Sequence, residues 1–320
     1  MDGDRRHLCE ADLPEPFRML GKRLSNWGRW GADDRIGTLN FITPERLIAA
    51  AKLVRTGKLF DLGIPISAQG PQMGGARTNP VHLMSITPLD FRGREDGLMV
   101  ADDYIFMALQ SVTQWDGLGH VGYDDRLYND IPTASVTSMG GSTQLSIDQI
   151  AAKGVAGRGV LLDIAALKGV ESLDAGEGIR VADLEAAEAR QGVRAGSGDI
   201  LLVRTGWIRQ FLVDRSPAAY WDGNPGLDYS CAEWLHSREV AVIASDNWCV
   251  ETIPAGNGDY AIPFHSIAIR DMGMTLGEIF DLEALARDCA DDRVWEFFFT
   301  APPLKVSGGV GSAITPLAIK

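Results

Sequence analysis

The sequence predicts an α/β protein in which helices flank a mixed β-sheet. Two segments carry helix signals, and four short apolar runs lack the polar–apolar alternation of a half-exposed strand. Runs of this kind are typical of strands that are buried on both faces. Because predicted helices separate several of the runs, we expect some strands to be parallel neighbours joined by crossover connections.

The first predicted helix covers residues 43–57. Thr43 is suited to be its N-cap, Pro44 to occupy the first helical position, and Glu45 follows in the first turn. Gly57 is expected to end the helix, because glycine commonly terminates helices in a left-handed conformation.

A second helix is predicted over residues 180–192, where Leu184 and several alanines recur at helical spacing before Gly192. The glycine-rich segments 72–76 and 307–313 are expected to be loops, because neither has the glycine spacing of a dinucleotide-binding turn. The apolar runs that predict strands are GVLLDIA from Gly159, DILLVRT from Asp199, EVAVIAS from Glu239 and VWEFFFTA from Val294.

The composition indicates one globular domain. The 320 residues are 45% hydrophobic, and no linker rich in proline, serine or charge divides them. We therefore expect a single domain over residues 1–320, with an N-terminal extension of about 25 residues.

The charge balance excludes two classes of partner. Lys and Arg total 30 against 43 Asp and Glu, which gives a net charge of -13. Such a surface repels phosphate backbones and anionic lipids, so neither a nucleic acid nor a membrane is an expected partner. No apolar run approaches the roughly 20 residues that span a bilayer. We expect a cytoplasmic location.

The four cysteines are far apart and form no C-x-x-C pair, which argues against a zinc knuckle or a disulfide scaffold. We expect reduced, buried thiols without a base or metal partner, and hence activity that is insensitive to thiol reagents. These cysteines are Cys9, Cys231, Cys249 and Cys289.

Chemistry-bearing side chains gather in TQWDGLGHVGYDD, residues 113–125. Asp116 lies four residues before His120, and farther along the chain Glu278 lies thirteen residues after His265. A spacing of four lets two side chains converge on one ion. The spacing alone leaves two interpretations open: a metal site, or a polar turn around Asp116 and His120 with His265 packed on a helix.

The remaining histidines carry weaker signals. His7 and His236 are interpreted as structural, whereas His82 is left open between the core and a functional site. No G-x-S-x-G motif occurs, and Ser312 has no histidine nearby in the sequence, so a serine hydrolase is not indicated.

Seven segments together resemble the cyclase family of metal-dependent hydrolases, which includes bacterial kynurenine formamidase and isatin hydrolase. The resemblance implies the swivelling β/β/α fold of kynurenine formamidase, and it covers nearly the whole chain. The segments are NWGRWGADDRIGTLNFITPE, WDGLGHVGYDDRLYN, GRGVLLDIA, GDILLVRTGW, WLHSREVAVIASDNWCVE, IPFHSIAIRDMGMTLGEIFDLEAL and GGVGSAITPLAI.

The family motif H-x-G-T-H-x-D-x-P-x-H is similar to Q-S-V-T-Q-W-D-G-L-G-H, which runs from Gln110 to His120. Two family histidines are therefore Gln110 and Gln114 here, and whether these amides bind metal is left open. The resemblance implies one divalent ion per chain, Zn²⁺ or Mn²⁺. The implied ligands are Asp116, His120, His265, Glu278 and Gln114.

The resemblance also implies a reaction. Water activated by the metal would open a small amide, cyclic amide or ester, with Asp116 and His120 in catalysis. The proton donor to the leaving group is left open between His82, Asp246 and the metal-bound water itself. The alternatives are a metal-dependent lactonase, dehydratase or cyclase of secondary metabolism, and a binding protein that kept the fold without chemistry.

A flat small-molecule substrate is held well by aromatic side chains that line its pocket. Residues at the ends of buried strands often bind ligands in open α/β sheets. Because relatives assemble into oligomers, the resemblance also implies a homodimer or homotetramer. The expected substrate-binding residues are Trp27, Trp30, Trp115, Tyr123, Arg204 and Trp207.

Overall fold

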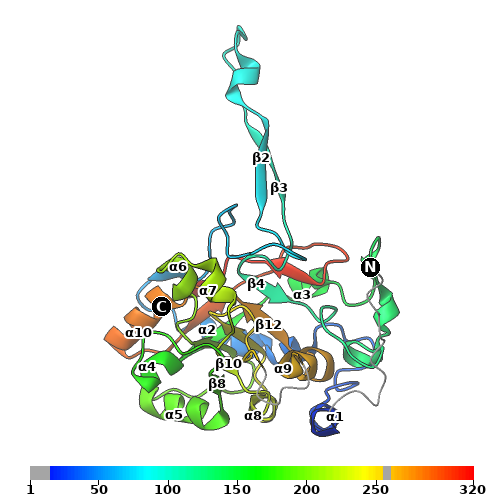
Figure 1. Ribbon diagram of the computed structural model, residues 1–320, viewed down its shortest axis with the longest axis vertical. Helices are drawn as coiled ribbons and strands as arrows, with labels where there is room; N and C mark the ends of the chain where they lie inside the picture. Colours follow the sequence, from blue (N-terminus) through cyan, green and yellow to red (C-terminus); the bar gives the residue numbers. More distant parts are fainter. Residues whose placement is uncertain (1–14, 255–260) are drawn as a thin grey trace.

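A mixed β-sheet forms the centre of the computed structural model, which describes residues 15–254 and 261–320 (Figure 1). Within these ranges the sheet has nine strands. In spatial order they are β1 (Leu59–Asp61), β15 (Leu317–Ile319), β13 (Glu296–Thr300), β7 (Ala156–Asp163), β9 (Ile200–Arg204), β11 (Val242–Ser245), β12 (Thr275–Glu278), β4 (Gln114–Asp116) and β14 (Gly311–Ala313).

Shorter elements surround the sheet. The remaining strands pair as β2 (Val81–Ile86) with β3 (Asp102–Phe106), β5 (Val136–Thr137) with β6 (Gly141–Ser142), and β8 (Gly178–Ile179) with β10 (Gly226–Leu227). The α-helices are α1 (Glu15–Arg23), α2 (Pro44–Ala51), α3 (Ile147–Lys153), α4 (Ile164–Lys168), α5 (Val181–Gln191), α6 (Arg209–Leu212), α7 (Pro217–Trp221), α8 (Cys231–Ser237), α9 (Pro263–His265) and α10 (Glu283–Asp292). The chain also forms a π-helix, η6 (Ser266–Met272). Its 3₁₀ turns are η2 (Gly37–Phe41), η3 (Pro88–Phe91), η4 (Tyr128–Asp130) and η5 (Thr133–Ser135).

Four central strands are parallel neighbours, in the order β7, β9, β11 and β12. Helices α4 and α5 connect the first two, and α8 lies between β9 and β11 in the chain. The flanking strands β13 and β4 are antiparallel to this core. The predicted α/β class, with a mixed sheet flanked by helices in one domain, is therefore confirmed.

Three of the four apolar runs form strands whose residues are mostly or entirely buried, as expected. The fourth, β13, instead alternates between buried and partly exposed residues, so one of its faces is less well covered. The segment 307–313 was expected to be a loop, but its last three residues form β14, which pairs with β4 at the edge of the sheet.

The first predicted helix is shorter than expected. Thr43 is its N-cap and accepts a hydrogen bond from the Arg46 backbone, but α2 ends at Ala51. The backbone N–H groups of Thr56 and Gly57 instead donate to the carbonyl of Lys320, which holds this segment against the last strand. The second helix is confirmed as α5, which ends on Gly192 in the left-handed conformation.

A long hairpin, β2–β3, extends away from the body of the molecule (Figure 1). Every residue of its two strands is exposed except one, which is partly exposed. His82 lies on this hairpin. In the part of the chain that the structure describes, no helix is long and apolar enough to cross a membrane.

Candidate metal centre

Two neighbouring strands place the acidic residues of the candidate centre. Strands β4 and β12 are antiparallel, with Gln114 directly opposite Glu278 and Asp116 two residues farther along β4. Residues two apart in a strand share a face, so Asp116 projects on the same side as Gln114. The Gln114 Nε2 atom donates a hydrogen bond of 2.7 Å to Glu278 Oε2.

His265 approaches these carboxylates from α9, which leads into the π-helix η6. Its Nε2 atom lies 3.1 Å from Glu278 Oε1 and 3.9 Å from Asp116 Oδ2. Its Nδ1 atom lies 2.5 Å from Glu251 Oε1. Burial lowers the pKa of His265, but the hydrogen bonds with Glu251 and Glu278 outweigh that effect and raise the pKa to about 10.

His120 lies just beyond β4 at the edge of the same cluster, with its Nε2 atom 3.8 Å from Asp116 Oδ1. About a fifth of its side chain is exposed, at 21%, whereas Asp116 is fully enclosed. Burial lowers the pKa of His120, the charge of Asp116 opposes that shift, and the charges of Arg77 and His265 add to it. The ring is therefore neutral at pH 7 and able to accept a proton.

The buried donors fit a divalent cation. Both carboxylate oxygens of Asp116 and the Oε1 atom of Gln114 are buried without a hydrogen-bond partner among the described residues. Burial of Glu278, with the charge of Asp116 adding to it, raises its pKa to about 7. Burying a carboxylate whose oxygens accept no hydrogen bond costs several kcal/mol, about 3 or more. A cation among these oxygens would remove that cost, and carboxylate plus imidazole is a donor set that Zn²⁺ and Mn²⁺ accept.

Cys249 lies among these candidate donors, a position that no sequence motif indicated. Its Sγ atom, a ring nitrogen of His265 and a carboxylate oxygen of Glu278 all lie within 4.8 Å of one another. Cys249 follows the carboxyl end of β11, where open α/β sheets place ligand groups. The sequence missed it because the three residues are separated by loops and match no spacing motif. Cys9 lies outside the described residues.

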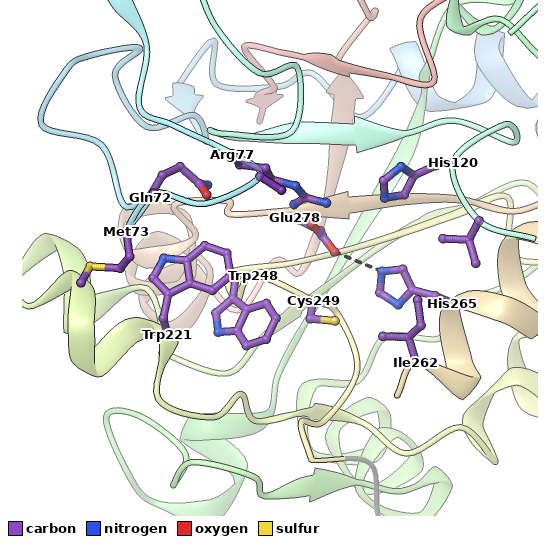
Figure 2. A pocket seen from close by; sticks show the side chains of 13 residues that line it. Gln72, Met73, Arg77, His120, Trp221, Trp248, Cys249, Ile262, His265 and Glu278 are labelled. Carbon is purple, nitrogen blue, oxygen red and sulfur yellow. Dashed lines mark hydrogen bonds and ion pairs between the residues drawn. The ribbon is translucent and has the colours of Figure 1, made fainter. Parts of the chain in front are cut away.

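A pocket of about 440 Å³ opens above the cluster, with His120, His265, Glu278 and Cys249 in its lining (Figure 2). Trp221 and Trp248 form an aromatic wall, with ring centroids 4.6 Å apart and ring planes at 33°. Their indole nitrogens are anchored to the backbone carbonyls of Pro71 and Gly223. A cavity with this size and lining suits a small aromatic molecule.

Arg77 supplies a positive charge to the same pocket. Figure 2 shows its guanidinium on the side of the pocket where Glu278 and His120 lie. Its Nη1 atom donates to the carbonyl of Gln110, which holds the side chain in place. No motif in the sequence singled out Arg77 or Trp221, because both reach the pocket from loop or short-helix segments far from the ligand motif.

The three tryptophans predicted as substrate walls lie elsewhere, and none lines the pocket. The Trp27 Nε1 atom donates to the carbonyl of Arg270, and Trp30 packs edge-on against Phe41 with ring centroids 5.1 Å apart. Trp115 is completely buried in the core. Aromatic composition does not show which way a side chain points, so the sequence could not place these rings relative to the pocket.

The other predicted substrate-binding residues also have structural partners. The Tyr123 hydroxyl donates to Asp271 Oδ2 at 2.7 Å, and Trp207 donates to the carbonyl of Tyr220. Arg204 forms ion pairs of 2.9 Å with Asp163 and 2.7 Å with Glu283. None of Tyr123, Arg204 and Trp207 lines the pocket.

The two side chains predicted as proton donors lie outside the lining of the pocket. His82 lies on the exposed hairpin, where its Nε2 atom is 2.7 Å from Asp103 Oδ2, and it does not line this chain's pocket. Asp246 is buried and accepts hydrogen bonds from the Thr205 backbone, the Thr205 hydroxyl and the Gly206 backbone. Burial raises the pKa of Asp246 to about 6, although these bonds oppose the shift. Asp246 organises the turn after β9.

Comparisons with known proteins agree with this architecture. Residues 60–252 match a family model described as "Putative cyclase". A solved structure described as a novel cyclase is 42% identical, covers 92% of this chain and 99% of its own, and has a TM-score of 0.86. No match was found among the curated proteins.

Two isatin hydrolase structures share the fold at lower identity. One, bound to the product analogue thioisatinate, is 18% identical, with a TM-score of 0.58 and coverage of 86% of this chain and 94% of that chain. Isatin hydrolase A from Ralstonia solanacearum is 20% identical, with a TM-score of 0.59 and coverage of 87% and 98%.

The fold and the buried carboxylate–imidazole cluster define an α/β protein with the architecture of the isatin hydrolases. The matched family model and the structure with 42% identity show the family directly. This chain belongs to the cyclase family, and the resemblance inferred from the sequence is confirmed.

Proposed function

We propose that the chain is a metal-dependent hydrolase that opens a small amide, cyclic amide or ester. The observation that carries the proposal is the buried Asp116 carboxylate, which has no hydrogen-bond partner among the described residues and lies 3.9 Å from His265. Asp116, His265 and Glu278 would hold one Zn²⁺ or Mn²⁺ ion per chain. A bound ion of this kind supplies Lewis acidity and lowers the pKa of water from about 16 towards about 7.

His120 is the residue best placed to move a proton. Its lowered pKa leaves the ring neutral, and it lines the pocket next to Asp116. In the reaction a water oxygen forms a bond to the substrate carbonyl carbon, and the bond from that carbon to nitrogen or oxygen breaks. His120 would accept the proton of the water and return it to the leaving atom.

The pocket walls fit an aromatic substrate and an anionic product. Trp221 and Trp248 provide flat apolar surface, which favours an aromatic ring. Arg77 faces the same cavity, and a guanidinium binds a carboxylate well because its donors match the two oxygens. An isatin-like cyclic amide has this shape, and its opening produces a carboxylate.

The decisive test combines metal analysis with a substrate panel of N-formyl anilines, isatins, imides and lactones. We expect about one ion per chain after dialysis, turnover of an amide or cyclic amide, and loss of turnover with a chelator. Turnover of lactones alone would favour the lactonase alternative. Absence of both metal and turnover would favour a binding protein.

Histidine variants separate the roles within the centre. His265→Ala is expected to lose the ion, and His236→Ala to change nothing. His120→Ala should abolish turnover: retention of the ion would identify His120 as the proton carrier, and loss of the ion would identify it as a ligand. Full metal content and full activity in both His120→Ala and His265→Ala would refute the hydrolase proposal.

We also propose that the chain assembles as a homodimer or homotetramer through the hairpin β2–β3. The register pairs Val81 with Phe106 and Leu83 with Tyr104, so these four apolar residues share one face. Their exposed fractions are 46%, 78%, 62% and 69%. An isolated hairpin is marginally stable, and a second copy of the chain would cover this face by two-fold symmetry. A cytoplasmic location remains a prediction from the sequence.

A further inference from the structure

We infer that Cys249 is a direct ligand of the ion that this proposed hydrolase holds, and that its thiolate makes the centre selective for Zn²⁺ over Mn²⁺. The inference rests on the proposed metal dependence and adds to it a ligand of a different chemical class. Carboxylate and imidazole donors accept either ion, whereas a thiolate is a soft donor that favours zinc.

The first support is the position of the sulfur. The Sγ atom, a ring nitrogen of His265 and a carboxylate oxygen of Glu278 lie within 4.8 Å of one another. Ligand atoms about 2.0 to 2.3 Å from one tetrahedral ion lie roughly 3 to 4 Å apart, so small side-chain adjustments suffice to close this set on one ion. In Figure 2 Cys249 lies on the same side of the pocket as His265.

The second support is the set of buried polar atoms beside the sulfur. The two carboxylate oxygens of Asp116 have no hydrogen-bond partner among the described residues, and one lies 3.9 Å from the His265 ring. Buried oxygens without a partner are typical of a position that a cation or an ordered water can fill. Asp116 therefore supplies a fourth donor to the group formed by Cys249, His265 and Glu278.

The third support is a contrast between the described cysteines. The Cys231 sulfur donates to the carbonyl of Ile179 at 3.3 Å, and the Cys289 sulfur accepts from Lys320 Nζ at 3.7 Å. Among the hydrogen bonds of residues 15–254 and 261–320, none involves the sulfur of Cys249. Of these three thiols, Cys249 alone lines the pocket.

The local backbone holds Cys249 and Glu251 on either side of a strained residue. Val250 has a φ of 51°, which a β-branched residue rarely adopts. Its backbone N–H donates to Asn247 Oδ1 at 2.7 Å, and the N–H of Glu251 donates to the Cys249 carbonyl. Glu251 contacts the Nδ1 edge of His265. The strained turn thus holds both Cys249, the inferred ligand, and Glu251, which orients the ligand His265.

A nucleophilic role for Cys249 fits the contacts less well. A catalytic thiol needs a base with a free acceptor nitrogen. The imidazole grouped with the sulfur, His265, has Nδ1 at 2.5 Å from Glu251 and Nε2 at 3.1 Å from Glu278.

The test uses the full chain stripped of metal and titrated with Co²⁺, whose electronic spectrum reports its ligands. We expect about one cobalt per chain and a sulfur-to-cobalt charge-transfer band in the near ultraviolet. The band should disappear in Cys249→Ser and remain in Cys289→Ser, a matched change at another buried thiol. Zn²⁺ affinity should fall at least about 10-fold in Cys249→Ser, with a smaller loss for Mn²⁺.

The outcomes separate this inference from the proposed function. Cobalt that binds with visible ligand-field bands but no charge-transfer band would refute sulfur ligation and leave a metal hydrolase intact. Failure of the wild-type chain to bind cobalt or zinc would refute both. If Cys249→Ser does not fold, Cys249→Asp provides a charged oxygen donor and should bind cobalt without the band; a band that persists there would also refute the inference.

Discussion

The Glu251 Oε1 atom lies 2.5 Å from His265 Nδ1, on the edge of the imidazole opposite Glu278. The same carboxylate accepts hydrogen bonds from the backbone N–H groups of Phe264 and His265. Glu251 therefore fixes both the ring and the start of α9. With Nδ1–H donating to Glu251, the Nε2 atom is directed at Glu278 and Asp116, as a metal-binding imidazole requires.

Glu251→Gln is expected to weaken metal binding by about 10 to 100-fold, because a neutral amide orients the imidazole less strongly and makes it less basic. The dissociation constant for Zn²⁺, measured by competition with a chromophoric chelator, checks this. Glu171→Gln is a suitable control, since the Glu171 side chain is 82% exposed and pairs with Arg209. Unchanged affinity in Glu251→Gln would show that the carboxylate does not support the ligand.

Gln114→Ala is expected to lower kcat more than metal content. The Gln114 Nε2 atom holds Glu278 Oε2 at 2.7 Å, so its loss frees the carboxylate to rotate while Asp116 and His265 stay in place. A loss of about 10-fold in kcat with about one ion per chain is the expected pattern. Loss of the ion itself would instead identify the amide as a direct ligand. Gln110→Ala provides the comparison at the other replaced histidine.

Trp248→Ala is expected to raise KM for flat aromatic substrates by about 10-fold, because stacking contributes about 1 kcal/mol beyond the area it buries. Aliphatic amides should be affected less. Trp30→Phe is the informative control, since Trp30 was predicted from the sequence but packs against Phe41 away from the pocket. A KM that changes in Trp30→Phe and not in Trp248→Ala would refute the assignment of the aromatic wall.

Local patterns predicted the centre of the sheet well. The runs that became β7, β9 and β11 are buried and apolar, so each one carries its own strand signal. Strand β4 is only Gln114–Asp116, and β12 is only Thr275–Glu278. Such short strands with polar residues carry no sequence pattern that predicts a strand. Their register depends on pairing between residues that are more than 150 positions apart in the chain.

The site was predictable where it follows the family motif and not where loops assemble it. The family resemblance drew attention to Asp116, His120, His265 and Glu278, and the structure brings all four to one pocket region. Cys249, Arg77 and Trp221 reach the pocket from segments whose direction only the tertiary fold decides. The apolar residues of β2 and β3 similarly suggest a core strand, yet the structure exposes them.

Asp246→Asn is expected to destabilise the protein by about 1 to 3 kcal/mol without loss of metal, because an amide cannot accept all of the hydrogen bonds that the carboxylate now receives. Chemical denaturation and metal analysis together check this. Normal stability with loss of turnover would instead support a catalytic role for Asp246.

The pH dependence of stability in the wild type and in Asp246→Asn provides a second test of the role of Asp246. Its pKa is raised from 3.8 to about 6 in the fold by burial, so between these values the folded state binds more protons than the unfolded state. The Asp246 contribution to the free energy of unfolding therefore falls as pH rises from 3.8 to about 6 and is constant above. The difference in the free energy of unfolding between wild type and Asp246→Asn should therefore change with pH only over this range.

The double change Leu83→Lys with Tyr104→Lys is expected to weaken self-association by at least about 10-fold, which corresponds to about 1.4 kcal/mol. The two residues are directly opposite in the hairpin register and are 62% and 69% exposed. Placing charges on both should leave the body of one chain folded while preventing burial of the face. Light scattering across micromolar concentrations measures the result, and Met139→Lys, at a side chain 96% exposed off the hairpin, is the control. A wild-type chain that is monomeric throughout, or a variant with the wild-type molar mass, would remove the hairpin from the interface.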